Sequence, residues 1–296
     1  MTTVISLENV SKSYRGFSMV SQVTLQAEQG SVLGIVGPKG AGKSTVLYLV
    51  SGILKPTSGT VATVSARGGG SPSMGVLIEG TGIYPNLAVR DQVEIRRRAL
   101  SLPAEETERV LGTFGLKFAE SAKAGQLALP VRNRLGIALA MMGDPEILLL
   151  DEPFRGFTFR EIDTFRTLIR EYVSRTGGTV VITSEKAEET GGLADTFLIL
   201  DRGRSVKQDT SEGISSSIPG YMKLEADPLD LAKEVLDRMG IYGYRTINSR
   251  TLFIYEQYER LEEIREALLS AGVYVTELSL VQDSISDYYT QGRADR

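Results

Sequence analysis

The chain reads Gly37-Pro38-Lys39-Gly40-Ala41-Gly42-Lys43-Ser44 directly after an apolar run at 32–36, and a segment with a helical pattern follows at 44–53. Every fixed position of the G-x-x-x-x-G-K-[ST] phosphate loop is present, between a strand and a helix as the mechanism of this loop requires. The glycines let backbone N–H groups curl around phosphate oxygens, and the helix N-terminus adds positive potential. We therefore expect Lys43 to reach the terminal phosphates of a nucleotide and Ser44 to offer its hydroxyl to Mg²⁺.

A second motif ends the strand that is predicted at 146–151, where the chain reads Leu150-Asp151-Glu152. The C-terminal edge of parallel strands is where open α/β sheets bind their ligands. Asp151 is expected to hold Mg²⁺, and Glu152 to orient an attacking water. A strand that ends in Asp-Glu is by itself often only a solvated terminus. Downstream of a phosphate loop, the pair favours a site for a metal and a water molecule.

Composition narrows the chemistry that such a site can use. Lys and Arg number 33 and Asp and Glu 37, so the formal charge of -4 gives no basic excess, and nucleic acid is disfavoured as a partner. Cys and His are both absent, which excludes disulfides, thiolate ligands and a histidine base. No apolar run reaches the roughly 18 residues of a membrane-spanning helix, and the N-terminus lacks the pattern of a signal peptide. We expect a cytoplasmic chain that attaches to a membrane only through a partner.

The pattern of apolar residues predicts two parts. Strands are expected at 4–10, 22–28, 32–36, 60–65, 74–79, 146–151, 179–184, 196–201 and 204–208, with a mostly helical region at 87–126 and helices from 130 and at 160–175. Because strands alternate with helices, most of this sheet should be parallel, with an antiparallel β subdomain formed by the first strands.

A Gly- and Ser-rich stretch at 211–220 is typical of a linker. After it the pattern is strand, helix 228–239, two strands that end near Glu256, helix 258–271 and strand 273–281, which favours a ferredoxin-like sandwich at 221–296. Leu261, Ile264, Leu268 and Ala271 would share one face of the second helix. The predicted fold class is α/β, with a small α+β domain at the C-terminal end.

With the phosphate loop and the Asp151-Glu152 pair in place, residues 4 to about 210 resemble the ATP-binding cassette (ABC) family. The linker Gly75-Val76-Leu77-Ile78-Glu79-Gly80-Thr81-Gly82-Ile83-Tyr84-Pro85-Asn86-Leu87 is similar to that of bacitracin and lantibiotic self-protection exporters, in which Glu can replace the Q-loop glutamine. The ending Asp283-Ser284-Ile285-Ser286-Asp287-Tyr288-Tyr289 is similar to the same group. The resemblance implies a cassette domain at 1–210 with a helical subdomain at about 87–143.

The resemblance also implies a set of ligand contacts. ATP would be contacted by Tyr14, whose ring would stack on adenine, and by Gly37, Pro38, Lys39, Gly40, Ala41, Gly42, Lys43, Ser44, Thr45 and Glu79. Mg²⁺ would be held by Ser44, Asp151 and Glu79. The implied partners are a membrane permease, one helix of which would dock beside Ile83 and Tyr84, and a second ATP-binding subunit.

Three motifs depart from the family pattern. The signature segment, usually Leu-Ser-Gly-Gly-Gln, is here Leu127-Ala128-Leu129-Pro130-Val131-Arg132-Asn133-Arg134, in which Ala128 lacks a hydroxyl and Pro130 lacks an N–H. Thr158 stands at the D-loop aspartate, and Glu185 stands at the switch histidine. A carboxylate about 4 Å from the γ-phosphate would be repelled by several kcal/mol at an effective dielectric near 20.

These features predict an ATP-binding and ATP-hydrolysing subunit of an exporter at the cytoplasmic face of the membrane, with Glu152 and Glu185 at the catalytic positions. Because a homodimer would place both kinds of defect in each composite site, a heterodimer is favoured. One alternative is a regulatory subunit that binds ATP without hydrolysing it. A remote alternative is a small-molecule kinase with a lid formed by Arg96, Arg97 and Arg98, which a solvated helix face explains more simply.

Overall fold

The computed structural model describes residues 2–78, 82–216 and 220–282 of the chain. These residues fall into two compact units, with the division between Ile214 and Ser215. Each unit has its own cluster of buried apolar side chains. Among the described residues, none of the helices combines the length and the apolarity that a membrane crossing requires.

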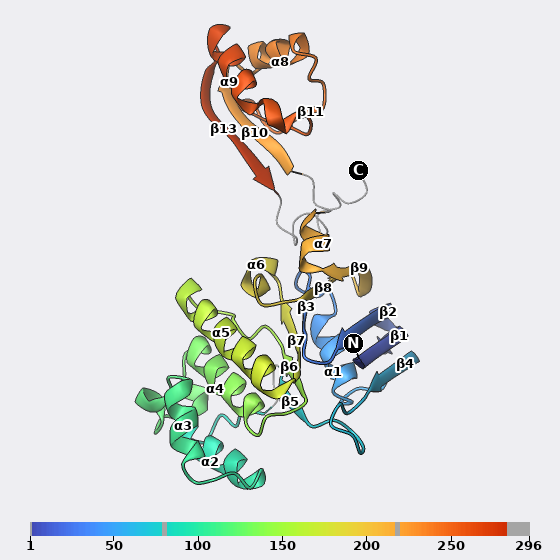
Figure 1. Ribbon diagram of the computed structural model, residues 1–296, viewed down its shortest axis with the longest axis vertical. Coiled ribbons are helices and arrows are strands. Elements are labelled where there is room, and N and C mark those ends of the chain that lie inside the picture. Colours follow the sequence, from blue (N-terminus) through green and yellow to red (C-terminus); the bar gives the residue numbers. More distant parts are fainter. Residues whose placement is uncertain (1, 79–81, 217–219, 283–296) are drawn as a thin grey trace. The chain divides into compact units, whose positions relative to one another are not determined.

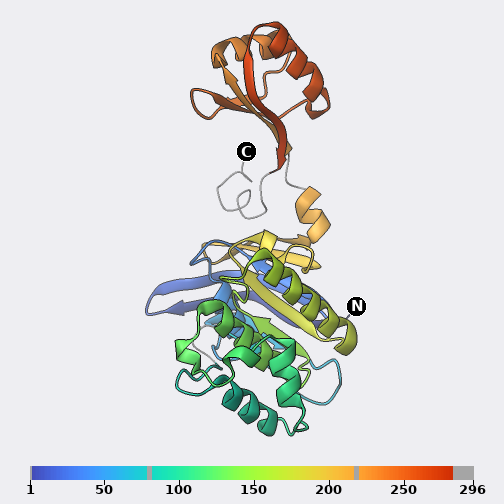
Figure 2. The same ribbon diagram turned by 90° about the vertical axis from the view of Figure 1, so that its left-hand side faces the viewer.

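The first unit contains two sheets (Figures 1 and 2). The smaller is an antiparallel sheet of order β2-β1-β4, built from β1 (Thr3–Tyr14), β2 (Phe17–Glu28) and β4 (Ser58–Thr63). The larger has the order β5-β6-β7-β3-β8-β9 and is built from β3 (Val32–Val36), β5 (Met74–Leu77), β6 (Ile147–Leu150), β7 (Thr179–Ser184), β8 (Thr196–Asp201) and β9 (Arg204–Thr210). Only β9, at the edge, is antiparallel to its neighbour.

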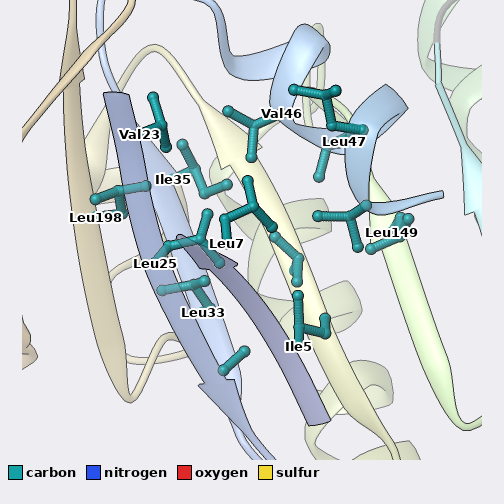
Figure 3. Packing of buried hydrophobic residues seen from close by; sticks show 14 of the residues in the cluster. Ile5, Leu7, Val23, Leu25, Leu33, Ile35, Val46, Leu47, Leu149 and Leu198 are labelled. Carbon is teal, nitrogen blue, oxygen red and sulfur yellow. The ribbon is translucent and has the colours of Figure 1, made fainter. Parts of the chain in front are cut away.

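The central strands of the larger sheet carry apolar side chains on both faces, as expected for parallel strands that are covered on each side. All residues of β3, β6 and β7 are buried. Figure 3 shows the packing on one face, where side chains of the larger sheet meet those of the smaller sheet and of helix α1 (Lys43–Val50). The phosphate loop therefore leads into a helix whose apolar face is fixed between two sheets.

The remaining helices of the first unit are α2 (Val89–Ala99), α3 (Glu106–Thr113), α4 (Leu129–Met141), α5 (Phe159–Thr176) and α6 (Ala187–Thr190), with short 3₁₀ turns at Lys117–Ala119 and Ala124–Gln126. The sequence explains the ends of α5 well. Thr158 and Glu161 form a capping box at its start, and Gly177 takes the left-handed conformation (φ 66°) at its end.

The second unit consists of β10 (Gly220–Asp227), α8 (Leu229–Arg238), β11 (Tyr244–Thr246), β12 (Thr251–Ile254), α9 (Leu261–Ser270) and β13 (Tyr274–Gln282), with a 3₁₀ turn at Tyr258–Arg260. Its antiparallel sheet has the order β11-β12-β10-β13. Both helices lie on one face of this sheet (Figures 1 and 2). They contribute to a single core, in which Ile264 and Leu268 are fully buried. The unit is thus an α+β sandwich.

Two local details differ from what the sequence pattern suggests. Helix α1 ends at Val50 rather than near residue 53, because Gly52 takes a left-handed conformation (φ 74°) that terminates the helix. The linker expected at 211–220 begins with a helix, α7 (Ser211–Ser216). The Gly213 N–H donates to Thr210 Oγ1 at 3.0 Å, and Ile214 is fully buried, so hydroxyl capping and one apolar anchor order a stretch whose composition is typical of a linker.

The separate cores lead to a prediction about truncation, because we propose that the N-terminal part folds independently. A chain that ends at residue 217 keeps every strand of both sheets of the first unit, so it should unfold cooperatively at a temperature close to that of the intact chain. A matched chain that ends at Asp201 lacks β9 and should lose stability, since β8 would become an exposed edge. Thermal unfolding followed by circular dichroism measures both. An unfolded 217-residue chain would show that the proposed boundary is wrong.

Candidate nucleotide-binding site

A cleft of about 910 Å³ lies where the phosphate loop, the C-terminal end of β6 and the start of α4 come together. Its lining comprises Ser18, Met19, Lys39, Gly40, Gly42, Lys43, Ser44, Thr45, Leu77, Ile78, Ile83, Pro85, Ala124, Gly125, Leu129, Arg132, Asn133, Asp151, Glu152, Arg155 and Glu185. The fold therefore brings the phosphate loop together with two groups of residues that lie more than 80 positions further along the chain.

The loop needs its glycines at two positions for steric reasons. A Cβ atom on Gly37 would lie 2.0 Å from the carbonyl oxygen of Leu200, so β8 passes too close for any side chain. Gly42 has φ 98°, and a Cβ there would lie 2.7 Å from Val20 Cγ1. Because the backbone of the loop carries no bulk at these points and runs into the N-terminus of α1, it fits the phosphate-binding role that the sequence predicts.

Lys43 lies almost completely buried at the base of the cleft, with 7% of its side chain exposed. Its Nζ donates to the carbonyl oxygens of Gly37 at 2.8 Å and Pro38 at 3.2 Å. The third partner of Nζ is Glu152 Oε1, at 3.0 Å. The ammonium group is therefore held by loop carbonyls and by the carboxylate of the second motif, at the place where phosphates would approach.

Glu152 is held in an unusual conformation by its surroundings. Its backbone is left-handed, with φ 44°, which is rare for a residue with a side chain. The Glu152 N–H donates to Thr183 Oγ1 at 2.9 Å. Burial raises the pKa of the Glu152 carboxyl, and the negative charge of Glu185 raises it further, although Lys43 acts in the opposite direction. An acidic group with a raised pKa, fixed in a cleft, is suited to accept a proton from a bound water.

Thr183 is a residue of the site that the sequence analysis missed. Its hydroxyl donates to Asp151 Oδ1 at 2.6 Å and accepts the N–H of Glu152, so one side chain of β7 orients both carboxyl residues after β6. The available signal was a threonine one position before the end of a buried strand that neighbours β6. Only the strand order, with β7 beside β6, gives that threonine its role.

Ser44 and Asp151 line the same cleft, as expected for residues that share a metal ion. The third proposed metal ligand, Glu79, lies outside the described residues together with Gly80 and Thr81. Among the residues that the structure describes, no group of three or more Asp, Glu, His or Cys side chains could hold a metal. One hydroxyl and one carboxylate fit Mg²⁺, which usually takes few protein ligands beside phosphates and water and would neutralise phosphate charge when bound.

Glu185 directly follows β7 and lines the cleft beside Glu152. Its backbone N–H donates to Glu152 Oε2 at 3.3 Å, so the position expected for the switch histidine does adjoin the water-orienting carboxylate. The carboxylate of Glu185 adds negative charge where phosphate charge would accumulate. The repulsion of a γ-phosphate by this carboxylate stays a prediction.

Tyr14 does not lie in the cleft lining of the described residues. Its ring is 61% exposed at the end of β1, with the Arg15 guanidinium 5.3 Å from the ring centroid. The neighbouring strand β2 reaches the cleft through Ser18 and Met19. A stacking role for Tyr14 remains a prediction.

The altered signature segment starts helix α4. Ala128 is the N-cap residue and supplies no side-chain hydrogen bond, and Pro130 occupies the first turn, where a missing N–H costs the helix nothing. The D-loop position, Thr158, caps α5, because its Oγ1 accepts the Glu161 N–H at 3.4 Å and its own N–H donates to Glu161 Oε2 at 2.6 Å. Both departures from the family pattern are therefore compatible with the local helix starts, while they remove donors or charge from the surface.

The three arginines that suggested a kinase lid lie on α2, outside the cleft lining of the described residues. Arg97 and Arg98 each form an ion pair with Glu94 at 2.7 Å. Arg96 lines a different groove, of about 360 Å³, with Ile83, Tyr84 and Ile95. This placement does not support a kinase lid, although only Arg98, with 74% of its side chain exposed, lies on a solvated face, and Arg97 is 15% exposed.

Comparison with known proteins agrees with this geometry. The profile of the family described as "ABC transporter" matches residues 20–155. The chain is 26% identical over 296 residues to an uncharacterized ABC transporter ATP-binding protein, YcbN, of Bacillus subtilis (strain 168), with 98% of this chain and 96% of that protein covered. It is 24% identical to the bacitracin transport ATP-binding protein BcrA of Bacillus licheniformis, with 98% and 97% covered.

A shorter relative and a solved structure each cover about 70% of this chain. The lantibiotic transport ATP-binding protein SrtF of Streptococcus pyogenes is 27% identical, with 71% of this chain and 92% of that protein covered. The structure described as "Dimeric Structure of MJ0796, a Bacterial ABC Transporter Cassette" is 23% identical, has a TM-score of 0.60 and covers 70% of this chain and 98% of its own. This last likeness shows the fold, a mixed α/β cassette. The chain therefore carries a domain of the ABC transporter family.

Proposed function

We propose that the chain binds Mg-ATP at Gly37–Ser44 and hydrolyses it slowly as the ATP-binding subunit of an ABC exporter. The single observation that carries the proposal is the placement of Lys43 and Glu152 at 3.0 Å in one cleft, with Ser44 and Asp151 in the same lining. Phosphate, metal and attacking water would then all have a residue of the right chemistry nearby. Relatives named for bacitracin, lantibiotic and Nod factor transport support export of peptides or other amphiphiles.

The partner that we propose is a separate membrane permease, which would hold the chain at the cytoplasmic face of the membrane. The groove beside α2 supports this, because it carries exposed apolar side chains: Tyr84 is 61% and Ile95 52% exposed. Its floor includes Gly136, where a Cβ would lie 2.4 Å from Leu77 Cδ1. The absence of a side chain there keeps the floor of the groove close to β5, and an amphipathic helix is the kind of ligand that fits.

We further propose that the second ATP-binding subunit is a different chain. In a homodimer, each composite site would combine Glu185 with a signature segment in which Ala128 offers no hydroxyl and Pro130 offers no N–H. In a heterodimer these defects separate, and the site with Lys43, Asp151 and Glu152 of this chain would face the intact signature of the partner. Each missing transition-state donor can lower the rate of hydrolysis by about 10²- to 10³-fold. A heterodimer in which one site keeps its donors should therefore hydrolyse ATP faster than a homodimer.

A specific observation also supports the second candidate function, an ATP-holding regulatory subunit. Glu152 engages Lys43 instead of facing an open position for water, and Glu185 adjoins it. If nucleotide binding leaves Glu152 unable to orient a water, the chain would retain ATP without turnover. Phosphate release from the purified complex distinguishes the two candidates, because only the first predicts release that depends on Glu152.

The central prediction concerns nucleotide binding. Replacing Lys43→Ala removes the only ammonium group that the described loop residues hold buried against the carboxylate of Glu152, and should abolish measurable ATP binding in isothermal calorimetry. The matched control is Lys12→Ala on β1, whose ammonium group donates to the Lys55 carbonyl on the surface. That variant should bind like the unaltered chain. Unchanged ATP affinity in Lys43→Ala would contradict the proposed site.

A second prediction concerns the pH dependence of hydrolysis. Only ionised Glu152 can accept a proton, so the rate should fall as the pH drops through its raised pKa, above the value of about 4.3 of an ordinary glutamate. Replacing Glu185→Gln removes a neighbouring negative charge that raises this pKa, so the acid limb of the pH–rate profile should shift to lower pH. Glu152→Gln serves as the control, because its residual rate should show no such limb. An acid limb that stays in place or moves to higher pH in Glu185→Gln would be evidence against Glu152 as the base.

A further inference from the structure

Two arginines of the cleft lining, Arg132 and Arg155, have no role in the proposed function. Arg132 lies in the first turn and a half of α4, and Arg155 lies in the loop after β6. Within residues 2–78, 82–216 and 220–282, neither guanidinium forms an ion pair with a carboxylate, whereas Lys43 is engaged by Glu152. The cleft therefore has cationic side chains whose charge is uncompensated by the protein.

The loop that carries Arg155 is tied to the helix that carries Arg132. Asn133 Nδ2 donates to the Arg155 carbonyl oxygen at 3.0 Å, which ties the loop to α4. Gly156, with φ 85°, lies directly against Pro130, since a Cβ there would be 3.3 Å from Pro130 Cγ. The proline of the altered signature thus packs on the glycine that follows Arg155. Pro130, which has no N–H to donate, therefore packs against the loop that carries the Arg155 guanidinium.

Arg134, two residues further along α4, shows what a structural arginine looks like in this region. Its guanidinium forms an ion pair with Glu161 and lies 6.0 Å from the centroid of the Phe157 ring. Both the ion pair and the cation–π contact are therefore made within the protein. Arg132 and Arg155 have no comparable contacts among the described residues and face the cleft instead. The difference between these arginines points to a ligand with negative charge.

The chemistry of that ligand follows from the groups that the start of α4 lacks, which are acidic side chains and neutral hydrogen-bond donors. Helix α4 has no acidic residue in its first turn, so its N-terminus remains favourable for an anion. Ala128 cannot offer a hydroxyl and Pro130 cannot offer an N–H, which leaves fewer neutral donors at this helix end. A guanidinium supplies several N–H donors in a planar fork that matches two oxygens of a phosphate group.

We propose that Arg132 and Arg155 together bind the terminal phosphate of a nucleoside triphosphate and so replace the hydroxyl and backbone donors that Ala128 and Pro130 have lost. The inference rests on the proposed function, because it requires a nucleotide. The terminal phosphate could belong to either of two nucleotides. One is the nucleotide on the phosphate loop of this chain, and the other is the nucleotide on the loop of a second chain in a dimer.

The test is the preference for ATP over ADP, measured by calorimetry on the full chain with Mg²⁺. Each of Arg132→Gln and Arg155→Gln should weaken ATP binding by about tenfold, the loss expected for one charge-assisted contact, and ADP binding much less. The matched control is Arg160→Gln, an exposed arginine in the first turn of α5 outside the cleft lining. It removes the same charge and should leave the ATP to ADP ratio unchanged.

Repeating the titrations over a range of protein concentrations separates the two sources. A lower ATP to ADP ratio at every concentration assigns the contact to the nucleotide of the same chain. A lower ratio that emerges only where the chain dimerises assigns it to the nucleotide of the second chain. Arg132→Lys and Arg155→Lys, which keep the charge but lose the fork, should fall between the unaltered chain and the glutamine variants.

Two results would overturn the inference. The first is an ATP to ADP ratio that is unchanged in the glutamine variants at all concentrations, with unaltered thermal unfolding. The second is an equal loss for Arg160→Gln, which would reduce the effect to net charge. Failure of the unaltered chain to bind ATP is a different outcome, because it would contradict the proposed function itself. In that case the Lys43→Ala replacement would also leave ATP binding unchanged.

Discussion

The ammonium group of Lys43 lies almost wholly out of water, so its charge must be compensated from within the cleft. Two loop carbonyls and the Glu152 carboxylate supply that compensation. The contact with Glu152 joins the loop after β3 to the end of β6, and Thr183 joins the end of β6 to β7. Three neighbouring regions of the sheet are therefore positioned around one cation. The geometry of the candidate site depends on this arrangement.

In the same arrangement, Glu152 and a bound triphosphate would both interact with the Lys43 ammonium group. A triphosphate that binds the loop must compete with Glu152 for the ammonium group, and in doing so it would release the carboxylate toward the position of an attacking water. Burial and Glu185 raise the pKa of Glu152, so a released Glu152 would be a better proton acceptor than a glutamate in water. Nucleotide binding and the preparation of the base would thus be coupled through one ion pair.

Local sequence patterns predicted much of the fold because the relevant information is local. The phosphate loop is a short motif between a strand and a helix, and the capping box of α5 involves two residues three positions apart. The contacts that define the site are not local. Thr183 is 31 residues from Glu152, and Lys43 is more than 100 residues from it, so only the strand order brings them together. Helix α7 was missed since its anchor, buried Ile214, stands alone in a Gly- and Ser-rich stretch.

The most direct test of this account is a crystal structure of the chain with Mg²⁺ and a non-hydrolysable ATP analogue. The account predicts that Lys43 Nζ lies within about 3 Å of a β- or γ-phosphate oxygen, a normal hydrogen-bond distance, and that Glu152 no longer pairs with it. A nucleotide bound away from the loop, or a bound nucleotide that leaves the Lys43–Glu152 pair intact and makes no contact with Nζ, would contradict it.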